Sequence, residues 1–195
     1  MPNTTTATAP RRGDWMETYT GKRFYPTDPR PEDVDIADIA HALSLICRFN
    51  GHVSHHYSVA QHSVHCAQLA VKMGFNPEMQ FLALMHDAAE AYVCDLPRPL
   101  KYSMMGAYAP IEGAVETAIH QRFEIQPFSC WQHTTIKKLD DTVLYCEARQ
   151  LLSKAEWVPE GTGYSIEIPK WTPEFAELCF IANFTRLEPL RGRKV

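Results

Sequence analysis

The stretch 81–95 places a histidine and an aspartate side by side within an apolar helical pattern. At helical periodicity His86 and Glu90 share one otherwise apolar face, and Asp87 lies at its flank. Ionisable groups on a core-facing surface cost free energy unless they are paired, hydrogen-bonded or bound to a metal. Imidazole and carboxylate are good ligands for zinc, manganese or iron. The stretch alone leaves two interpretations open, a metal site and an ordinary His–Asp pair at a helix end.

Two further ionisable residues interrupt apolar helical faces elsewhere in the chain. His62 lies in the apolar stripe of a predicted helix at 58–74, and Asp140 lies in that of a predicted helix at 131–155. Each alone is more often structural, as a satisfied core histidine or an acid at the edge of a stripe. Together with His86 and Asp87, they supply two imidazoles and two carboxylates. Such a set can fill four positions of one divalent site and leave room for water or substrate.

A series of helices is predicted to position these residues, and the fold class is all-α with a small N-terminal β-hairpin around Thr20 and Gly21. Typical N-cap residues and helix-ending glycines mark most helix boundaries. The expected helices cover residues 35 to about 48, 58–74, 76–93, 110–123, 131–155 and a last segment from 172. Residues 1–13 are polar and small and are expected to be disordered or loosely held. Residues 14–190 are expected to form a single domain.

A proline-rich segment follows the His86–Asp87 stretch. Residues 94–101 contain Pro97 and Pro99 and are expected to form a non-helical loop. This loop would hold an aspartate, an arginine and a lysine beside the candidate metal site, which is a suitable place to bind a ligand.

Composition excludes several classes of function. The 195-residue chain is 45% hydrophobic and 22% charged with a net charge of -4, so we expect no general binding to nucleic acid. Its six cysteines are widely spaced and without a CxxC pair, which favours reduced core residues. There is no recognisable signal peptide and no apolar run of the ~20 residues that a membrane span requires. We therefore expect a cytoplasmic protein that does not contact membranes.

The order His62, then His86–Asp87, then Asp140 resembles the signature of the HD-domain phosphohydrolase superfamily. The segments YSVAQHSV (57–64) and HDAAEAYVCDLPRPLK (86–101) make the resemblance more specific, as do TYTGKRFYPTDP and DIADIAHALSLICRFNGH before them. They are similar to bacterial HD 5′-nucleotidases and to small phage dATP triphosphohydrolases, over about residues 18–152. The phage enzymes remove dATP where 2-aminoadenine replaces adenine.

The resemblance implies an HD-type helical core that holds one catalytic divalent metal ion per subunit. Its ligands would be His62, His86, Asp87 and Asp140, with zinc, cobalt or manganese favoured and magnesium as an option. Glu90 takes the place of the family's catalytic glutamate and would act as general base or acid. Its ordinary alternative is a surface salt bridge.

The fourth ligand is assigned to Asp140 rather than Asp141 by the family pattern. That pattern places a leucine four residues and a glutamate seven residues after the aspartate, and here these are Leu144 and Glu147. The assignment leaves Asp141 as an alternative one residue away.

The resemblance and the charge of phosphate also suggest substrate contacts. Arg48, Lys101 and Lys137 are candidates for binding phosphate. Phe49 would stack on a base or sugar, and Asp95 would bind the deoxyribose hydroxyl. The alternatives are a solvated lysine, a core aromatic residue and an aspartate that caps the proline-rich turn.

Two histidines lie between the HD pair and the last aspartate. His120 and His133 occupy the interval where HD enzymes with two metals carry further ligands, but the expected motif around them is missing. We therefore interpret them as surface or capping residues and expect a mononuclear site. Family members also suggest a homo-oligomer, for example a hexamer, with active sites near subunit interfaces.

Three functions are compatible with these features. The leading one is metal-dependent hydrolysis of deoxynucleotide phosphates, with dATP first and dADP and dAMP as further substrates, to deoxyadenosine and phosphates. In a phage-infected host cytoplasm this reaction would deplete dATP. The alternatives are a 5′-deoxynucleotidase restricted to monophosphates and a non-catalytic module that binds a nucleotide or a metal.

Overall fold

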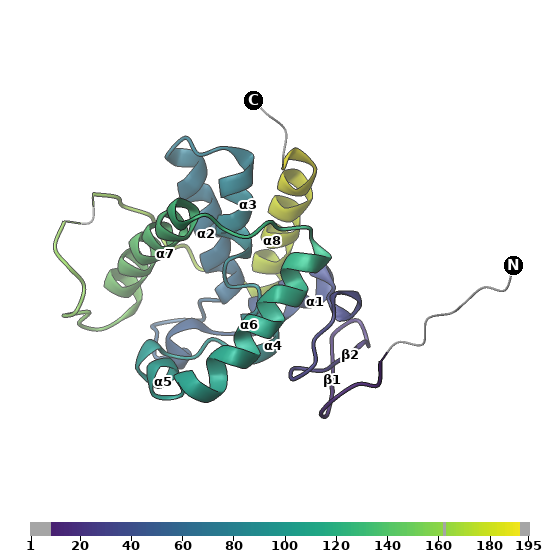
Figure 1. Cartoon of the computed structure of the whole chain (residues 1–195). Coiled ribbons are helices and arrows are strands. Elements are labelled where there is room, and N and C mark those ends of the chain that lie inside the picture. Colours follow the sequence, from purple (N-terminus) through teal and green to yellow (C-terminus); the bar gives the residue numbers. More distant parts are fainter. Residues whose placement is uncertain (1–8, 162, 192–195) are drawn as a thin grey trace, which may run out of the picture.

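The computed structural model describes residues 9–161 and 163–191, and these residues form a mostly helical protein (Figure 1). The α-helices are α1 (Ile36–Leu45), α2 (Val59–Lys72), α3 (Pro77–Met85), α4 (Glu90–Val93), α5 (Arg98–Ser103), α6 (Met105–Arg122), α7 (Cys130–Leu151) and α8 (Pro173–Leu187). Short 3-10 helices are η1 (Pro31–Asp33), η2 (Arg48–Gly51) and η3 (Glu188–Leu190). Strands β1 (Met16–Glu17) and β2 (Arg23–Phe24) pair antiparallel near the N-terminus. The predicted all-α class with a small N-terminal hairpin is thereby confirmed.

Helix α2 forms the centre of the core. It packs against α1, α3, α7 and α8, and in Figure 1 it lies beside α3 and α8. Its start is fixed by Ser58, whose side chain accepts a hydrogen bond from the backbone N–H of Gln61. Most of the helix is buried, including Val59, Val64 and Ala67. Polar residues on α2 therefore lie inside the molecule and must find their partners there.

The helix predicted at 76–93 is interrupted at the His–Asp pair. Helix α3 starts as expected at Asn76 and Pro77, but it ends at Met85, and α4 begins only at Glu90. The four residues between them form a tight turn with i→i+3 hydrogen bonds, such as that from the Ala88 N–H to the Met85 carbonyl at 3.0 Å. The pair therefore lies in a turn between two helices.

The prediction of a non-helical segment at 94–101 is wrong in its second half. Helix α5 begins at Arg98, and Pro99 is its second residue, where a proline is tolerated because the missing N–H has no helical partner. Helix α6 likewise begins at Met105, before Pro110, instead of starting at this proline.

Other helix boundaries differ less from the prediction. Helix α1 ends at Leu45, and a separate 3-10 turn covers Arg48–Gly51, where we expected the helix to end. Helix α7 ends at Leu151 rather than at 155, and a short strand considered for 161–168 is absent from the described residues of this segment.

The N-terminal segment that we expected to be loose is described only in part. Residues 1–8 lie outside the described residues. In the remainder, Arg11 donates hydrogen bonds to the Asp28 carbonyl at 3.0 Å and to the Asp33 carboxylate at 2.5 Å. These contacts hold residues near Arg11 against the loop that precedes α1.

Candidate metal site and pocket

His62 lies at the centre of a group of side chains from three separate parts of the chain. Its imidazole is fully buried on α2. The Nε2 atom lies 3.3 Å from Asp140 Oδ1 on α7, 3.4 Å from His86 Nε2 and 3.6 Å from Asp87 Oδ2. The structure thus brings together all four residues that the sequence suggested as metal ligands.

The spacing of these atoms fits a single divalent ion. Ligand nitrogens and oxygens lie about 2.0–2.2 Å from zinc, so two ligands of one ion are about 3.0–3.5 Å apart. The separations around His62 Nε2, and the 3.2 Å between His86 Nε2 and Asp87 Oδ2, fall in or close to this range. His86 Nδ1 lies 2.9 Å from the Ala83 carbonyl, which leaves its Nε2 free to bind. The donor set therefore fits the group that the sequence suggested.

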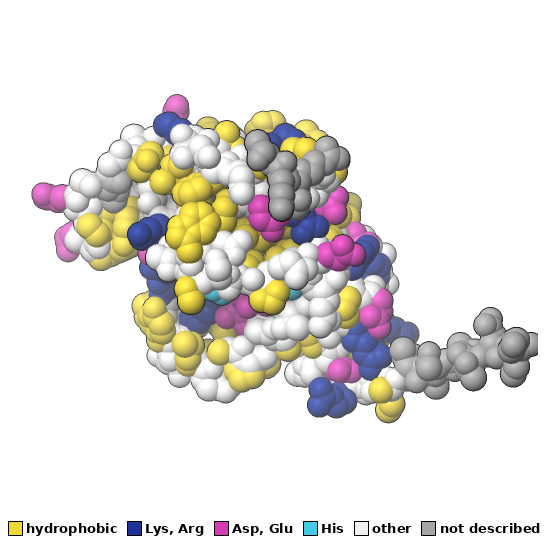
Figure 2. Space-filling model, turned by 45° about the horizontal axis from the view of Figure 1, so that its top comes forward, with side chains coloured by type: hydrophobic (Ala, Val, Ile, Leu, Met, Phe, Trp, Pro, Cys, Tyr) yellow, Lys and Arg dark blue, Asp and Glu magenta, His cyan; other side chains and the backbone are white. Residues whose placement is uncertain are grey.

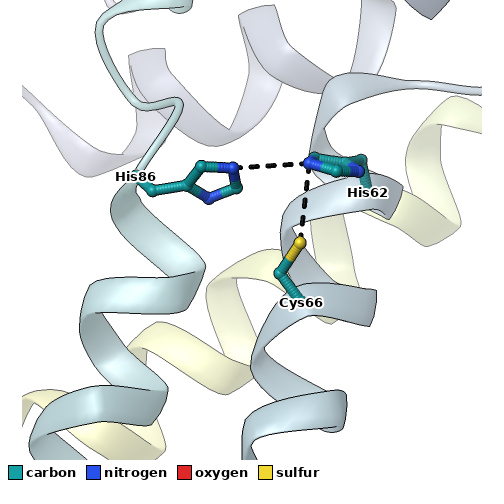
Figure 3. Close-up of side chains that lie close together, drawn as sticks. All are labelled: His62, Cys66 and His86. Carbon is teal, nitrogen blue, oxygen red and sulfur yellow. Dashed lines mark hydrogen bonds between the residues drawn. The ribbon is translucent and has the colours of Figure 1, made fainter. Parts of the chain in front are cut away.

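Cys66 adds a possible soft ligand that sequence reasoning had assigned to the core. Donor atoms of His62, Cys66 and His86 all lie within 4.8 Å of one another, so this buried cluster could hold a metal ion (Figure 3). The spacing of four residues between His62 and Cys66, which puts them on one helical face, is the signal that could have revealed it. Burial raises the pKa of the Cys66 thiol to about 11, and a protonated thiol is a weaker ligand than an ionised carboxylate.

Glu147 contacts Nδ1 of His62, the ring nitrogen that does not face the other candidate ligands. Its fully buried carboxylate accepts a hydrogen bond from His62 Nδ1 at 2.5 Å, from the Tyr57 hydroxyl at 2.7 Å and from Arg48 Nε at 3.2 Å. Because Nδ1 carries the proton, Nε2 presents its lone pair to the site. In the sequence, Glu147 was only a matching position in the family pattern. Its distance of seven residues from Asp140, two helical turns, puts both acids on one face of α7.

Charges around His62 favour a cation at this place. Burial and the charge of Arg48 lower the pKa of His62, but Cys66, Glu147 and Asp140 outweigh them and raise this pKa well above its ordinary value. Burial raises the pKa of Asp140, yet the two histidines lower it far below its usual range. The acids around His62 therefore favour positive charge at this place, which a divalent ion would supply in place of a proton.

Glu90 is a buried acid at the edge of the site. It is the first residue of α4, is 9% exposed, and its Oε2 has no hydrogen-bond partner among the described residues. Burial, together with the nearby charges of Asp87 and Asp95, raises the pKa of Glu90 well above its ordinary value. A buried carboxyl group with an unpartnered oxygen is unfavourable for stability, which is typical of functional sites.

A pocket of about 1060 Å³ opens beside these residues. All five predicted substrate contacts line it, and so do three of the four candidate ligands and Glu90. The lining includes Arg48, Phe49, Asp95, Lys101, Lys137, His86, Asp87, Asp140 and Glu90. Figure 2 shows a hollow in which cationic and acidic side chains gather next to a histidine. The volume suits a ligand of nucleotide size.

The pocket cations differ in how strongly the protein engages them. Arg48 is buried and donates to Glu147, with Asp87 3.5 Å away. Lys101 donates to Glu112 at 2.6 Å. Lys137 and Arg98 both form ion pairs with Asp140. Arg98 belongs to the proline-rich segment, and the sequence did not suggest it as a phosphate-binding residue.

Three other residues considered in the sequence lie in or next to the pocket. Asp141, the alternative to Asp140 as a ligand, accepts hydrogen bonds from the same two cations as Asp140 does. His120 and His133, interpreted as surface or capping residues, line the pocket, and their ring centroids lie 5.4 and 5.0 Å from that of Phe128, which also lines it. Part of the pocket wall is therefore aromatic.

The backbone at the pocket edge adopts an unusual conformation. Phe49 and Asn50 in η2 have φ angles of 56° and 51°, in the left-handed region. This region is unfavourable for a bulky residue such as phenylalanine. The turn places Phe49 in the pocket wall next to the buried Arg48.

Sequence comparisons place the chain among bacterial relatives. No protein-family model matches it. It is 42% identical to the uncharacterized protein YfdR of Escherichia coli (strain K12) over 182 residues, which cover 91% of this chain and 97% of YfdR. It is 34% identical to the uncharacterized protein RCAP_rcc00048 of Rhodobacter capsulatus over 113 residues, 56% of this chain and 58% of the relative. In the part of the chain that the structure describes, no helix is long and apolar enough to span a membrane. The extent of the first match shows that the chain belongs to the protein family of YfdR.

Proposed function

We propose that this protein is a metal-dependent phosphohydrolase of deoxynucleotides. The observation that carries the proposal is the convergence of two imidazoles and two carboxylates at ligand spacing around His62 Nε2, beside a pocket of nucleotide size. A preference for dATP, the HD-type mechanism and the dATP-depleting role in a phage-infected cell come from the sequence resemblance. Cytoplasmic location and a homo-oligomeric assembly belong to the same proposal.

Each residue of the site has a place in this proposal. His62, His86, Asp87 and Asp140 would hold one divalent ion, with zinc, cobalt or manganese favoured. When bound, such an ion polarises a phosphoryl oxygen and lowers the pKa of water. Glu147 keeps His62 in the required tautomer through the bond from Nδ1.

Glu90 would act as the general base or acid that transfers a proton during hydrolysis. It lines the pocket four residues after His86, and its Oε2 has no partner among the described residues, so this oxygen is available to an attacking water or a leaving group. Arg48 lies close to Asp87 and would stabilise negative charge on the phosphate next to the ligands. Phe49 and Asp95 in the pocket wall would contact the nucleoside.

A panel assay tests the proposal. Purified protein is incubated with dNTPs, NTPs and dNMPs in the presence of zinc, cobalt, manganese or magnesium, and phosphate and tripolyphosphate release are measured. We expect metal-dependent release that is greatest from dATP, and none from His62→Ala. Release from monophosphates alone would support the 5′-nucleotidase alternative. Metal binding without release from any substrate would contradict hydrolysis and favour a binding module.

A further inference from the structure

Two cations, Arg98 and Lys137, contact Asp140, and Asp141 contacts both of them. Asp141 Oδ1 accepts hydrogen bonds from Arg98 at 2.6 Å and from Lys137 at 2.7 Å. The same two cations reach Asp140 Oδ2, at 3.3 and 2.7 Å. Because both cations share both carboxylates, the guanidinium and the ammonium lie next to each other.

This pair borders the candidate metal ligands directly. The two oxygens of Asp140 face different groups, since Oδ1 lies 3.3 Å from His62 and Oδ2 contacts the cations. Arg98 and Lys137 line the pocket, and their side chains are 46% and 54% exposed. They therefore stand between the ligand set and the solvent, where a phosphate chain leaving the site would pass.

The other cations of the pocket are less exposed, because the side chains of Arg48 and Lys101 are 9% and 35% exposed. Arg48 is buried against Glu147, and Lys101 donates to Glu112 at 2.6 Å. A metal ion and Arg48 already provide the positive charge that one phosphate requires. Each further phosphate adds negative charge. The half-exposed side chains of Arg98 and Lys137 can reorient toward that charge while Asp141 keeps them near.

We propose that Arg98 and Lys137, positioned by Asp141, bind the phosphates beyond the one at the metal ligands. The pair would thereby select di- and triphosphates over monophosphates. This inference rests on the proposed phosphohydrolase function and specifies its substrate class. The pocket volume of about 1060 Å³ accommodates a nucleoside with a phosphate chain.

The test compares substrates that differ only in phosphate number. The kcat/KM for dATP, dADP and dAMP is measured for metal-loaded wild type, Arg98→Ala and Lys137→Ala, with Lys138→Ala as a control on the exposed next position of α7. Loss of one charge-assisted hydrogen bond should lower kcat/KM for dATP about tenfold or more and that for dAMP less than about threefold. Lys138→Ala should leave all three values unchanged.

Several results would overturn the inference. An equal loss for all three substrates would mean that Arg98 and Lys137 act only by positioning Asp140. A wild type that hydrolyses dAMP alone would leave a phosphohydrolase but contradict selection for polyphosphates.

A binding measurement separates the inference from the proposed function. If the wild type hydrolyses none of the three substrates, the proposed function fails. Calorimetry with the α,β-methylene analogue of dATP, compared with dAMP, then tests whether Arg98 and Lys137 bind the additional phosphates. Weaker binding of the triphosphate analogue to Arg98→Ala, with dAMP binding unchanged, would support the inference, and equal binding of the analogue to both proteins would overturn it.

Discussion

The inner and outer walls of the pocket are built in contrasting ways. The inner wall is a buried layer in which Arg48 lines the pocket and His62, Glu147 and Tyr57 lie behind it, and each of the four bonds to another member of the group. On the outer wall, Arg98 and Lys137 are half exposed and bond to Asp140 and Asp141. Buried polar groups need complete networks, which fix geometry, whereas exposed ion pairs contribute little stability. The structure thus separates a buried, fully bonded centre from an exposed rim. Under the proposed function the centre would hold the metal and the rim would select the substrate.

The most severe test of the inner wall removes its central ligand. His62→Ala should abolish metal uptake and turnover, because His62 Nε2 is the atom around which the other three candidate ligands gather. His65→Ala is the matched control, since His65 is also buried on α2 but contacts Tyr57 instead of the ligands. Metal content measured by mass spectrometry should be lost only in the first variant. Equal retention in both would refute the site.

Glu90→Gln should reduce turnover without affecting metal content. General acid–base catalysis contributes about 10²- to 10⁴-fold, and this variant keeps the size of the side chain while it removes proton transfer. Steady-state kinetics and metal analysis of the same preparation measure both properties. Unchanged turnover would show that another group moves the proton, and a loss of metal would show that Glu90 supports the ligands.

Glu147→Gln should weaken metal binding while the four ligands stay in place. Loss of a residue that orients a ligand typically lowers metal affinity about 10- to 100-fold. Tyr57→Phe removes only one of the three hydrogen bonds to Glu147 and should have a smaller effect in the same direction. Competition with a chromophoric chelator gives the affinities, and circular dichroism checks the fold. An unchanged affinity for Glu147→Gln would mean that the rigidity of the inner wall does not matter for the metal.

The stability of the inner wall should depend on pH through His65. Burial lowers the pKa of His65 to about 4, below its value of about 6.5 in an unfolded chain. The unfolded state therefore binds more protons between these two values. This contribution to the free energy of unfolding is fully present above about pH 6.5 and is lost as the pH falls toward 4, by roughly 3 kcal/mol in total.

Comparison with a variant isolates this contribution from that of other groups. Urea unfolding of wild type and His65→Gln from pH 4.5 to 7.5 measures the free energy of unfolding. The wild type should lose more stability toward low pH than the variant. Parallel curves would show that His65 takes up its proton in the folded protein without difficulty.

The sequence predicted those parts of the molecule that depend on local chemistry. Apolar periodicity and cap residues such as Ser58 and Asn76 located the helices of the core. Ionisable residues that interrupt the apolar faces of these helices identified His62, His86–Asp87 and Asp140 as candidate ligands. A helix boundary at Met85 escaped prediction because the turn after it is fixed by tertiary packing, while its residues have ordinary helical propensity.

Residues whose role depends on a distant partner could not be found in this way. Arg98 lies 42 residues from Asp140 in the chain and meets it only because the fold brings residues of α5 and α7 to the same pocket. Glu147 contacts His62 across 85 residues. A helical pattern reports which face a residue occupies but not what faces it, so such pairings require the structure.

The left-handed turn at Phe49 and Asn50 has a consequence for engineering. Holding a residue in this conformation costs of the order of 1–3 kcal/mol, and glycine would relieve this strain at either position. At Asn50 the relief would be small, because asparagine already tolerates such angles, and a polar side chain would be lost from the pocket lining. At Phe49 it would also remove an aromatic ring from the wall of the pocket. Under the proposed function, selection for thermal tolerance and selection for catalysis would therefore favour different residues at position 49.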